Sequence, residues 1–163
     1  DKTLLLRSYG FLGMIEAALS MGAFFLVWSQ HGYSLPDLQR ITPLIFSGMA
    51  DAAAQETYRQ STTMALSAII ACQVGNLFVC RSEREPFWRF SLATNVLIWA
   101  GIGTEIVIAG SLIYLPVFSA IFATQPLDWT NLFWLALCPL ILVVLEEGRR
   151  FLFQRFVHNR MSA

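Results

Sequence analysis

The chain has 163 residues, of which 56% are hydrophobic and only 13% are charged, and its formal net charge is zero. Because about a quarter of the residues in a soluble domain are typically charged, this composition indicates an integral membrane protein. Basic residues are not interleaved with aromatic ones as single-strand binding requires, so we expect no nucleic-acid partner.

The three cysteines, Cys72, Cys80 and Cys138, lie within or at the ends of apolar runs and show no CxxC spacing. This pattern favours buried, small hydrophobic side chains over disulfides or zinc ligands. The N-terminus lacks the basic region, apolar core and cleavage site of a signal peptide, and it begins without Met. We therefore expect the chain to be a segment of a longer protein.

Four apolar runs follow one another along the chain, and each can cross a bilayer core of roughly 30 Å as a helix. The third run is longer than a bilayer needs, so it is expected to tilt or to bend near Pro116, whose ring disrupts the helix ladder. The runs predict a single transmembrane domain over residues 1–163, with helices at about 4–29, 61–81, 89–118 and 129–154.

Nine of the eleven Lys and Arg residues lie in the N-terminal flank, in the short link between the second and third runs, and in the tail. The positive-inside rule therefore predicts that both termini and this link are cytoplasmic. The connection between the first and second runs is then external, and its residues 42–58 are expected to form a short interfacial helix. The predicted fold class is all-α, a membrane four-helix bundle with both termini cytoplasmic and one long external loop.

Two uncharged amides, Gln73 and Asn76, lie three residues apart in the second run, so they share one face of a helix. An amide without a partner in hydrocarbon is costly, so this face must meet protein or water. Amide oxygens can coordinate hard cations such as calcium, sodium or potassium. Hydrogen bonding between helices, worth ~0.6–2 kcal/mol, is the alternative that bare chemistry favours.

Acidic residues lie inside two runs, Glu16 in the first and Glu105 in the third, and an ionisable residue at membrane depth is a functional candidate. The small and packing-type neighbours of Glu16 favour a hydrogen-bonded carboxyl in a helix interface. Glu105 could bind a cation, carry a proton, or form a structural hydrogen bond to a neighbouring helix. A charged cluster follows the fourth run and is interpreted as a solvated helix end or as a docking or ion-pair cluster against a cytoplasmic partner: Glu146, Glu147, Arg149 and Arg150.

Taken in order, these runs resemble the C-terminal membrane region of type II P-type cation-transporting ATPases, the sodium/potassium and calcium pumps. SYGFLGMIEAALSMGAFF resembles their seventh membrane helix and CQVGNLFVCRSER the eighth. GIGTEIVIAGSLIYLP resembles the ninth helix, and LALCPLILVVLEEGRRF the tenth with its acidic-then-basic exit.

The resemblance implies specific ligand positions. In this family the eighth helix contributes a side chain to an ion site, and the matching residue is Gln73, as in the sodium/potassium pump. Asn76 stands where that pump has an Asp, so a negative charge is missing, and the Gln-x-x-Asn pair resembles the plasma-membrane calcium pumps. Glu105 matches a Glu near the third sodium site. Gln73, Asn76 and Glu105 are therefore implied as peripheral ligands of a metal cation (calcium, sodium or potassium).

The family's DKTGT phosphorylation sequence, nucleotide pocket and fourth to sixth membrane helices are absent from this chain. The resemblance thus implies a C-terminal domain that supports the transport helices without ATPase activity or a cofactor of its own, within a parent pump that uses ATP and Mg. Its expected partners are the lipid bilayer, which we expect to be the plasma membrane, and the remaining membrane helices and cytoplasmic domains of that pump.

The residues alone also admit two other function classes. One is a stand-alone four-helix membrane protein, either an interaction subunit or a pore subunit. The other is an intramembrane enzyme, against which the apolar runs show no paired His, Cys or carboxylate constellation.

Overall fold

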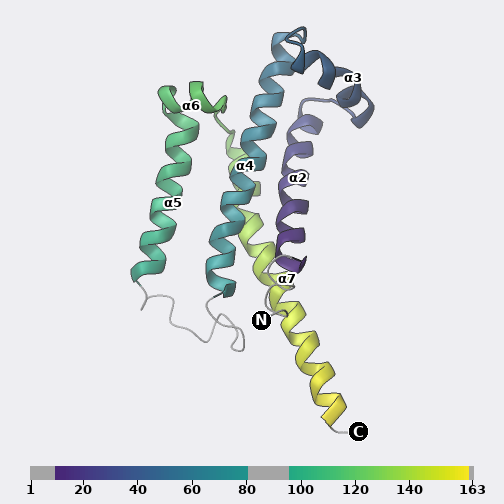
Figure 1. The fold of residues 1–163 in the computed structure, drawn as a ribbon, viewed down its shortest axis with the longest axis vertical. Coiled ribbons are helices and arrows are strands. Elements are labelled where there is room, and N and C mark those ends of the chain that lie inside the picture. The colour runs from purple at the N-terminus through teal and green to yellow at the C-terminus, as the bar shows by residue number, and fades with distance from the viewer. Residues whose placement is uncertain (1–9, 81–95, 162–163) are drawn as a thin grey trace.

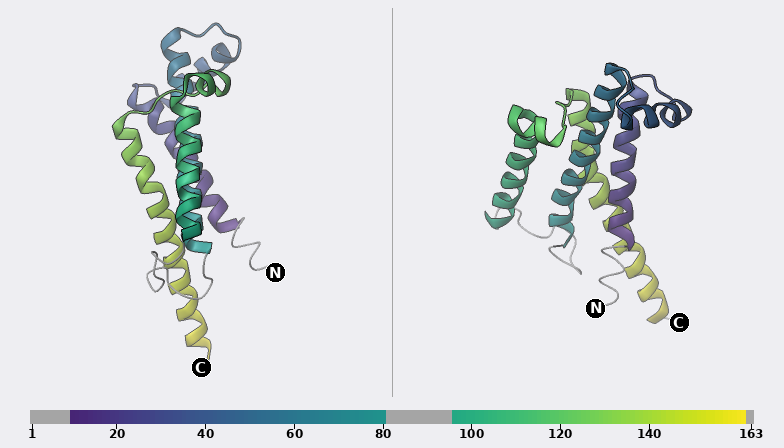
Figure 2. Two further views of the ribbon diagram at one scale, coloured as in Figure 1. Left: turned by 90° about the vertical axis from the view of Figure 1, so that its left-hand side faces the viewer. Right: turned by 45° about the horizontal axis from the view of Figure 1, so that its top comes forward.

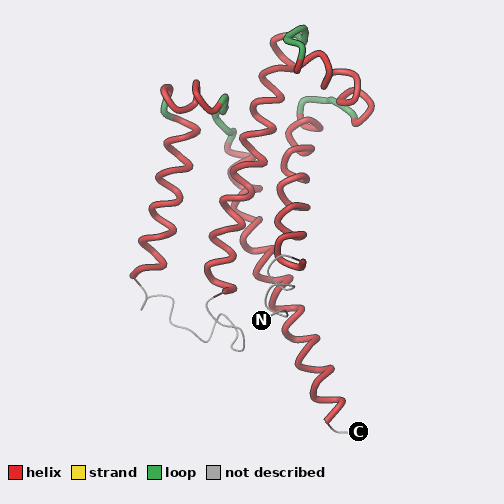
Figure 3. Tube along the Cα trace, viewed as in Figure 1, coloured by secondary structure: helices red, strands yellow, loops and turns green. Residues whose placement is uncertain are grey.

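The computed structural model describes residues 10–80 and 96–161, with side chains described for 10–79 and 96–152. Within these ranges the chain is a set of helices joined by short turns, without a strand (Figures 1 and 3). Four helices are long and apolar enough to cross a bilayer, at Gly10–Gln30, Ala52–Val79, Val96–Tyr114 and Trp129–Leu152. The predicted all-α membrane fold with four spanning helices is confirmed.

The first spanning helix, α2, covers Gly13–Gln30 and follows a short π-helical turn at residues 10–12. A turn leads into α3, Leu35–Phe46, which lies across the end of the bundle (Figure 1). Ser34 caps α3, because its backbone N–H donates to Asp37 Oδ2 at 2.9 Å and its hydroxyl donates to the same oxygen. Ser34 and Asp37 form a capping box, in which the Ser34 side chain accepts from the Asp37 backbone N–H and the Asp37 side chain accepts from the Ser34 backbone N–H, and this fixes where the helix begins.

The prediction of an interfacial helix at residues 42–58 is wrong in position, because the helix in this connection is α3 at Leu35–Phe46. α3 already ends at Phe46, and Gly48 follows in the left-handed region at φ 72°. Glycine adopts this conformation without a steric cost, so it terminates the helix readily. The chain then re-enters a helix at Ala52.

The second spanning helix, α4, covers Ala52–Cys80 and is 29 residues long. It begins well before residue 61, where the apolar run predicts its start. Its first half is rich in hydroxyl side chains, and these bond to carbonyls one turn back along the helix: Thr57 to Ala53, Ser61 to Thr57, Thr63 to Arg59 and Ser67 to Thr63. Hydroxyls satisfied in this way are compatible with a helix inside a membrane.

The long third run is divided by proline. α5 covers Val96–Tyr114, and α6 covers Pro116–Phe122. Leu115 between them is extended, with φ −83° and ψ 124°, because the ring of a following proline disfavours the helical conformation. The predicted helix at 89–118 therefore ends at Tyr114 within the described residues, and 89–95 lie outside them. The last helix, α7, covers Trp129–Met161.

The helices are packed around α4. It contacts α2 and α7 extensively and α5 only slightly, while α2 and α7 touch each other little. Figure 1 and the right-hand view of Figure 2 show α5 standing to one side of the α2–α4–α7 group. An apolar cavity of about 420 Å³ lies between α5 and this group, with walls that include Val74, Ile106 and Leu135.

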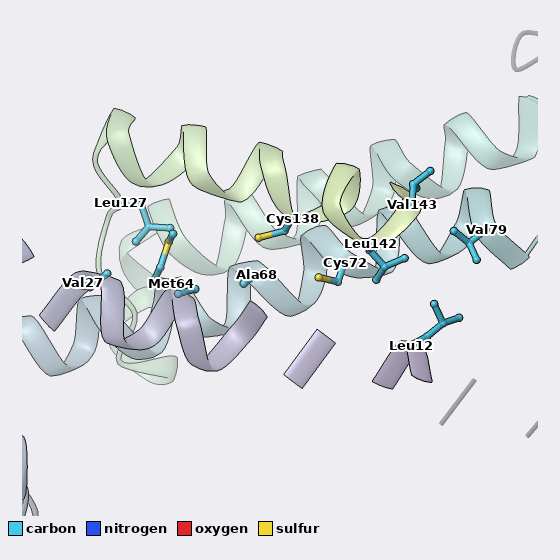
Figure 4. Close-up of a cluster of buried hydrophobic side chains, with 11 residues drawn as sticks. Leu12, Val27, Met64, Ala68, Cys72, Val79, Leu127, Cys138, Leu142 and Val143 are labelled. Carbon is cyan, nitrogen blue, oxygen red and sulfur yellow. The ribbon is translucent and has the colours of Figure 1, made fainter. Parts of the chain in front are cut away.

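The core of the bundle follows the shared surface of α2, α4 and α7 (Figure 4). Cys72 and Cys138 lie in it as free, buried thiols, which confirms their interpretation as small hydrophobic side chains. Close beside them, a Cβ added at Gly75 would lie 3.1 Å from Pro139 Cα, closer than ordinary van der Waals contact. The backbones of α4 and α7 therefore approach closely at a position that only glycine fits without a shift.

Candidate functional site

The two amides of α4 meet a carboxylate from α2. Gln73 Nε2 donates to Glu16 Oε1 at 2.7 Å, and Asn76 Nδ2 donates to Glu16 Oε2 at 3.5 Å. The first contact is a short hydrogen bond to a charged acceptor, and the second is at the outer limit of hydrogen bonding. The structure therefore brings Glu16, Gln73 and Asn76 together. Both amides form the hydrogen bonds between helices that the sequence offers as the alternative to binding a cation.

Glu16 and Gln73 lie at one depth of the bundle, and Asn76 lies about one turn nearer the end of α4. Glu16 is six residues from the start of its span at Gly10, and Gln73 is six residues from the end of its span at Val79. Because α2 and α4 run in opposite directions (Figure 1), these positions coincide along the bundle axis. At the rise of an α-helix they lie ~9 Å from the end of the spans.

The three side chains differ in exposure. Glu16 and Asn76 are half-buried, and Gln73 is exposed. Asn76 Oδ1 is buried and has no hydrogen-bond partner among the described residues. The site thus holds a carboxylate whose two oxygens accept hydrogen bonds, together with an amide oxygen that accepts none.

Gln73 lies within an otherwise apolar, exposed face of α4. Leu66, Ile69 and Leu77 are 36%, 39% and 40% exposed, and with Gln73 they recur every three or four residues, so the four share one face of the helix. Leucine and isoleucine on this face are compatible with lipid or protein. An amide is costly against hydrocarbon unless it is paired, so Gln73 favours a protein or aqueous neighbour on this side.

Glu105 is not part of this arrangement. It lies half-buried on α5 and has no hydrogen-bond or ion-pair partner among the described residues. A Cβ at Gly101, Gly103 or Gly110 would meet nothing within 4 Å, so these glycines do not mark a close helix contact within the described residues. The structure therefore brings Gln73 and Asn76 together but leaves Glu105 on a separate helix.

The charged cluster after the fourth run is an ion-pair cluster within the domain rather than a solvated helix end. Glu146 is fully buried, and Arg149 holds it with Nη2 at 2.7 Å and Nε at 2.8 Å. Arg150 contacts Glu146 at 3.3 Å and Glu147 at 3.0 Å. Arg150 Nη2 also donates to the carbonyl oxygen of Val79 at 2.7 Å, at the end of α4. The cluster is therefore built into the contact between α7 and α4.

The sequence contains a signal for part of this cluster. Arg149 and Arg150 follow Glu146 by three and four residues, the spacing of ion pairs on one helix. No local signal indicates that Arg150 reaches Val79, because that contact joins residues 71 positions apart. The sequence likewise predicts that Glu16 is a carboxyl in a helix interface, but it contains no signal that pairs Glu16 with Gln73.

The described residues contain no group of three or more His, Cys, Asp or Glu side chains that could hold a metal ion. A site on α2 and α4 can therefore offer one carboxylate and amide oxygens, which are hard ligands for a weakly held cation. Completing a coordination shell would require oxygens from elsewhere.

Comparison with known proteins identifies the family of this chain. The sequence model described as "Cation transporting ATPase, C-terminus" matches residues 1–152. The chain is 25% identical over 171 residues to the sodium/potassium-transporting ATPase subunit alpha of Tetronarce californica, which covers 95% of this chain and 16% of that protein. It is 24% identical over 170 residues to subunit alpha-2 of Homo sapiens, covering 96% of this chain and 16% of that protein.

A bacterial relative matches over a shorter stretch. The probable cation-transporting ATPase F of Mycobacterium tuberculosis (strain ATCC 25618 / H37Rv) is 28% identical over 90 residues, which is 53% of this chain and 10% of that protein. The chain thus spans 16% or less of the length of these relatives. With the family match over residues 1–152 and four helices able to span a bilayer, the chain belongs to the cation-transporting ATPase C-terminus family, as a C-terminal membrane domain of P-type cation ATPases.

Proposed function

We propose that this domain acts within a longer, ATP-driven cation pump, where it supports the moving transport helices and lends them peripheral ligands. In this proposal Gln73 and Asn76 contribute amide oxygens to a transported cation, which is calcium, sodium or potassium. Glu105 of α5 is a further peripheral ligand of the cation, separate from the pair on α4. The cation's main ligands come from membrane helices outside this chain.

The exposed position of Gln73 carries the proposal. This amide lies in the middle of the apolar face of α4 formed by Leu66, Ile69 and Leu77. Its hydrogen bond to Glu16 satisfies one amide proton and leaves the amide oxygen available. A neighbouring element that covers this face would place polar groups or a cation against that oxygen, which offsets the cost of an amide at membrane depth.

The chemistry that drives transport lies outside this chain in the proposal. The relatives' names identify them as ATPases, so we propose that the parent pump uses ATP and Mg²⁺ in its cytoplasmic domains, through a covalent phosphorylated intermediate. In this proposal the domain holds α4 in place while the transport helices move between the two states that expose the cation to opposite sides of the membrane. The stand-alone interaction or pore subunit is not favoured, because the family match covers residues 1–152.

The test is the substitution Gln73→Ala in the intact pump that contains this chain. The cation concentration for half-maximal ATPase activity should rise by about fivefold, the equivalent of losing one interaction of ~1 kcal/mol. Ile69→Ala is the matched control, because Ile69 lies on the same exposed face one turn away. A cation dependence that is the same for Gln73→Ala and the wild type would remove Gln73 from the site.

A further inference from the structure

Two thiols meet in the core between α4 and α7 (Figure 4). Cys72 of α4 forms a side-chain hydrogen bond with Cys138 of α7, and both cysteines are free. We infer that this pair is a redox modification site, at which a hydroperoxide oxidises the two thiols to a disulfide that joins α4 to α7. This modification is independent of the proposed role of Gln73 in cation binding.

The backbones of α4 and α7 approach closely at this level. A disulfide requires Cα atoms roughly 4.4–6.8 Å apart, and two helices meet this requirement more easily where a small residue lets their backbones approach. Cys72 is three residues before Gly75, and Cys138 directly precedes Pro139. A Cβ on Gly75 would lie 3.1 Å from the Pro139 Cα. The two sulfur atoms can therefore bond with little displacement of either helix.

Cys138 is the thiol that an oxidant reaches first. A cavity of about 220 Å³ between α2 and α7 has Cys138 in its wall, together with Leu19, Trp134 and Ile141. Cys138 is 6% exposed, whereas Cys72 is 0% exposed and lies outside this wall. The lining of the cavity is apolar, and Cys138 is nine residues from the start of its span at residue 129. The oxidant must therefore enter or cross hydrocarbon, which an uncharged hydroperoxide can do.

The hydrogen bonds also favour Cys138 as the attacking sulfur. A buried thiol is normally unreactive, because the thiolate is the nucleophile and apolar surroundings disfavour it. Cys138 donates its own S–H to the carbonyl oxygen of Trp134, at 3.5 Å. The Cys138 sulfur is therefore the acceptor in its hydrogen bond with Cys72. A donor at that sulfur stabilises the negative charge that develops on it as its proton leaves.

The oxidation balances in two steps. The Cys138 sulfur attacks one oxygen of the hydroperoxide, the O–O bond breaks, and the thiol proton passes to the leaving oxygen. The products are a sulfenic acid and an alcohol, or water where the oxidant is hydrogen peroxide. The Cys72 sulfur then attacks the sulfenic sulfur, the S–S bond forms, and the hydroxyl group leaves with the Cys72 proton as water. The two thiols lose two electrons in total, and the hydroperoxide gains them.

The arrangement of the pair favours the second step over further oxidation. Cys72 is already in contact with the sulfur that becomes the sulfenic acid, so its attack is intramolecular and needs no diffusing partner. The resulting disulfide holds α4 to α7 directly beside Gln73, which follows Cys72 in the chain. A dithiol reductant reverses the bond by thiol–disulfide exchange, so the pair is a reversible covalent link between two membrane helices.

The experiment oxidises the intact pump that contains this chain, reconstituted in phospholipid vesicles. In one arm hydrogen peroxide is added to the water around vesicles of saturated phospholipid, and in the other the vesicles contain a phospholipid hydroperoxide. The pump is then unfolded in N-ethylmaleimide, which alkylates the remaining free thiols, and its peptides are identified by mass spectrometry. We expect a peptide pair linked through Cys72 and Cys138, a loss of alkylation at both residues together, and reversal of both effects by dithiothreitol.

The two arms distinguish the sources of the hydroperoxide. Linkage only in vesicles with the phospholipid hydroperoxide assigns the oxidant to the bilayer, linkage only with hydrogen peroxide assigns it to water, and linkage in both arms admits either source. Cys80 is the internal control, because it lies eight residues from Cys72 in the same helix, about 12 Å along the axis and too far for a disulfide. Absence of the Cys72–Cys138 linkage in both arms, or equally abundant linkage of Cys80 to Cys138, overturns the inference.

Two single substitutions test the order of the steps. With dimedone present to trap sulfenic acids, Cys72→Ser should accumulate an adduct on Cys138, because the thiol that resolves the sulfenic acid is gone. Cys138→Ser should leave Cys72 without an adduct, because Cys72 lies outside the cavity wall. An adduct on Cys72 in that variant overturns the assignment of Cys138 as the first thiol. The linkage measurement on the wild-type pump needs no substitution, so it decides the inference even where a variant folds poorly.

Discussion

Arg150 donates a hydrogen bond to the backbone carbonyl oxygen of Val79 at 2.7 Å, and this contact joins α7 to the end of α4. The last carbonyls of a helix have no partner within the helix, and a cation near them also interacts favourably with the helix dipole. Arg150 is in turn held by the fully buried Glu146. One buried ion pair therefore fixes the end of the helix that carries Gln73 and Asn76.

Replacing Arg150 by alanine should lower the stability of the domain strongly. It leaves the Val79 carbonyl without its charged donor and Glu146 with Arg149 still paired to it, and losing a hydrogen bond to a charged group costs about 1.5–3 kcal/mol. The measurement is thermal unfolding of the detergent-solubilised pump. Arg149→Ala is the matched control, because Arg149 contacts the same carboxylate but is 31% exposed and makes no bond to Val79. Equal destabilisation by the two variants would contradict a role for the Val79 contact.

Replacing Gly75 by alanine should separate α4 from α7. The added Cβ would lie 3.1 Å from both Cα and the carbonyl oxygen of Pro139, and backbone atoms cannot move aside as a side chain can. Overpacking of this kind typically costs about 1–3 kcal/mol. Gly148→Ala on α7 is the control, since its Cβ meets nothing within 4 Å, and it should be neutral or slightly stabilising. Thermal unfolding is measured for both variants, and the unfolding temperature should fall for Gly75→Ala but stay the same or rise slightly for Gly148→Ala.

The spanning helices could be predicted from sequence because a bilayer imposes a length and an apolar composition on each of them. Their ends could not be predicted equally well. α4 begins at Ala52 because its hydroxyl side chains bond to their own helix, so the polar composition of its first half does not signal a loop. The break at Leu115 follows from Pro116, whose effect on the preceding residue is local and therefore visible in the sequence.

The candidate site could be predicted only in part, for the same reason. The i, i+3 spacing of Gln73 and Asn76 places them on one face of a helix from sequence alone. Their partner is 57 residues away from Gln73, on another helix, and pairing of that kind depends on how α2 and α4 pack. Glu105 lies on α5, which contacts α4 only loosely, and no local pattern encodes that packing.

The start of α3 should be sensitive to acid. Hydrogen bonds from the Ser34 hydroxyl and then the Ser34 backbone N–H lower the pKa of Asp37 below its usual value of 3.8. A carboxyl with a lowered folded-state pKa stabilises the fold above its unfolded pKa and loses that contribution as the pH falls through the folded value. Amide exchange at the start of α3 should therefore quicken below pH 3.8 beyond its intrinsic pH dependence. Asp37→Asn should remove this extra dependence, and an unchanged acid response in that variant would contradict the role of Asp37.

The hydrogen bond between Glu16 and Gln73 should be measurable as a coupling energy. In a double-mutant cycle with Glu16→Ala and Gln73→Ala, unfolding of the detergent-solubilised pump should give a coupling of about 0.6–1.7 kcal/mol, the range measured for polar pairs between membrane helices. The cycle with Asn76→Ala in place of Gln73→Ala is the control. Its coupling should be smaller, because the Asn76 contact is 3.5 Å long and the Gln73 contact is 2.7 Å long. A larger coupling to Asn76 than to Gln73 would contradict Gln73 as the main partner of Glu16 in the assembled pump.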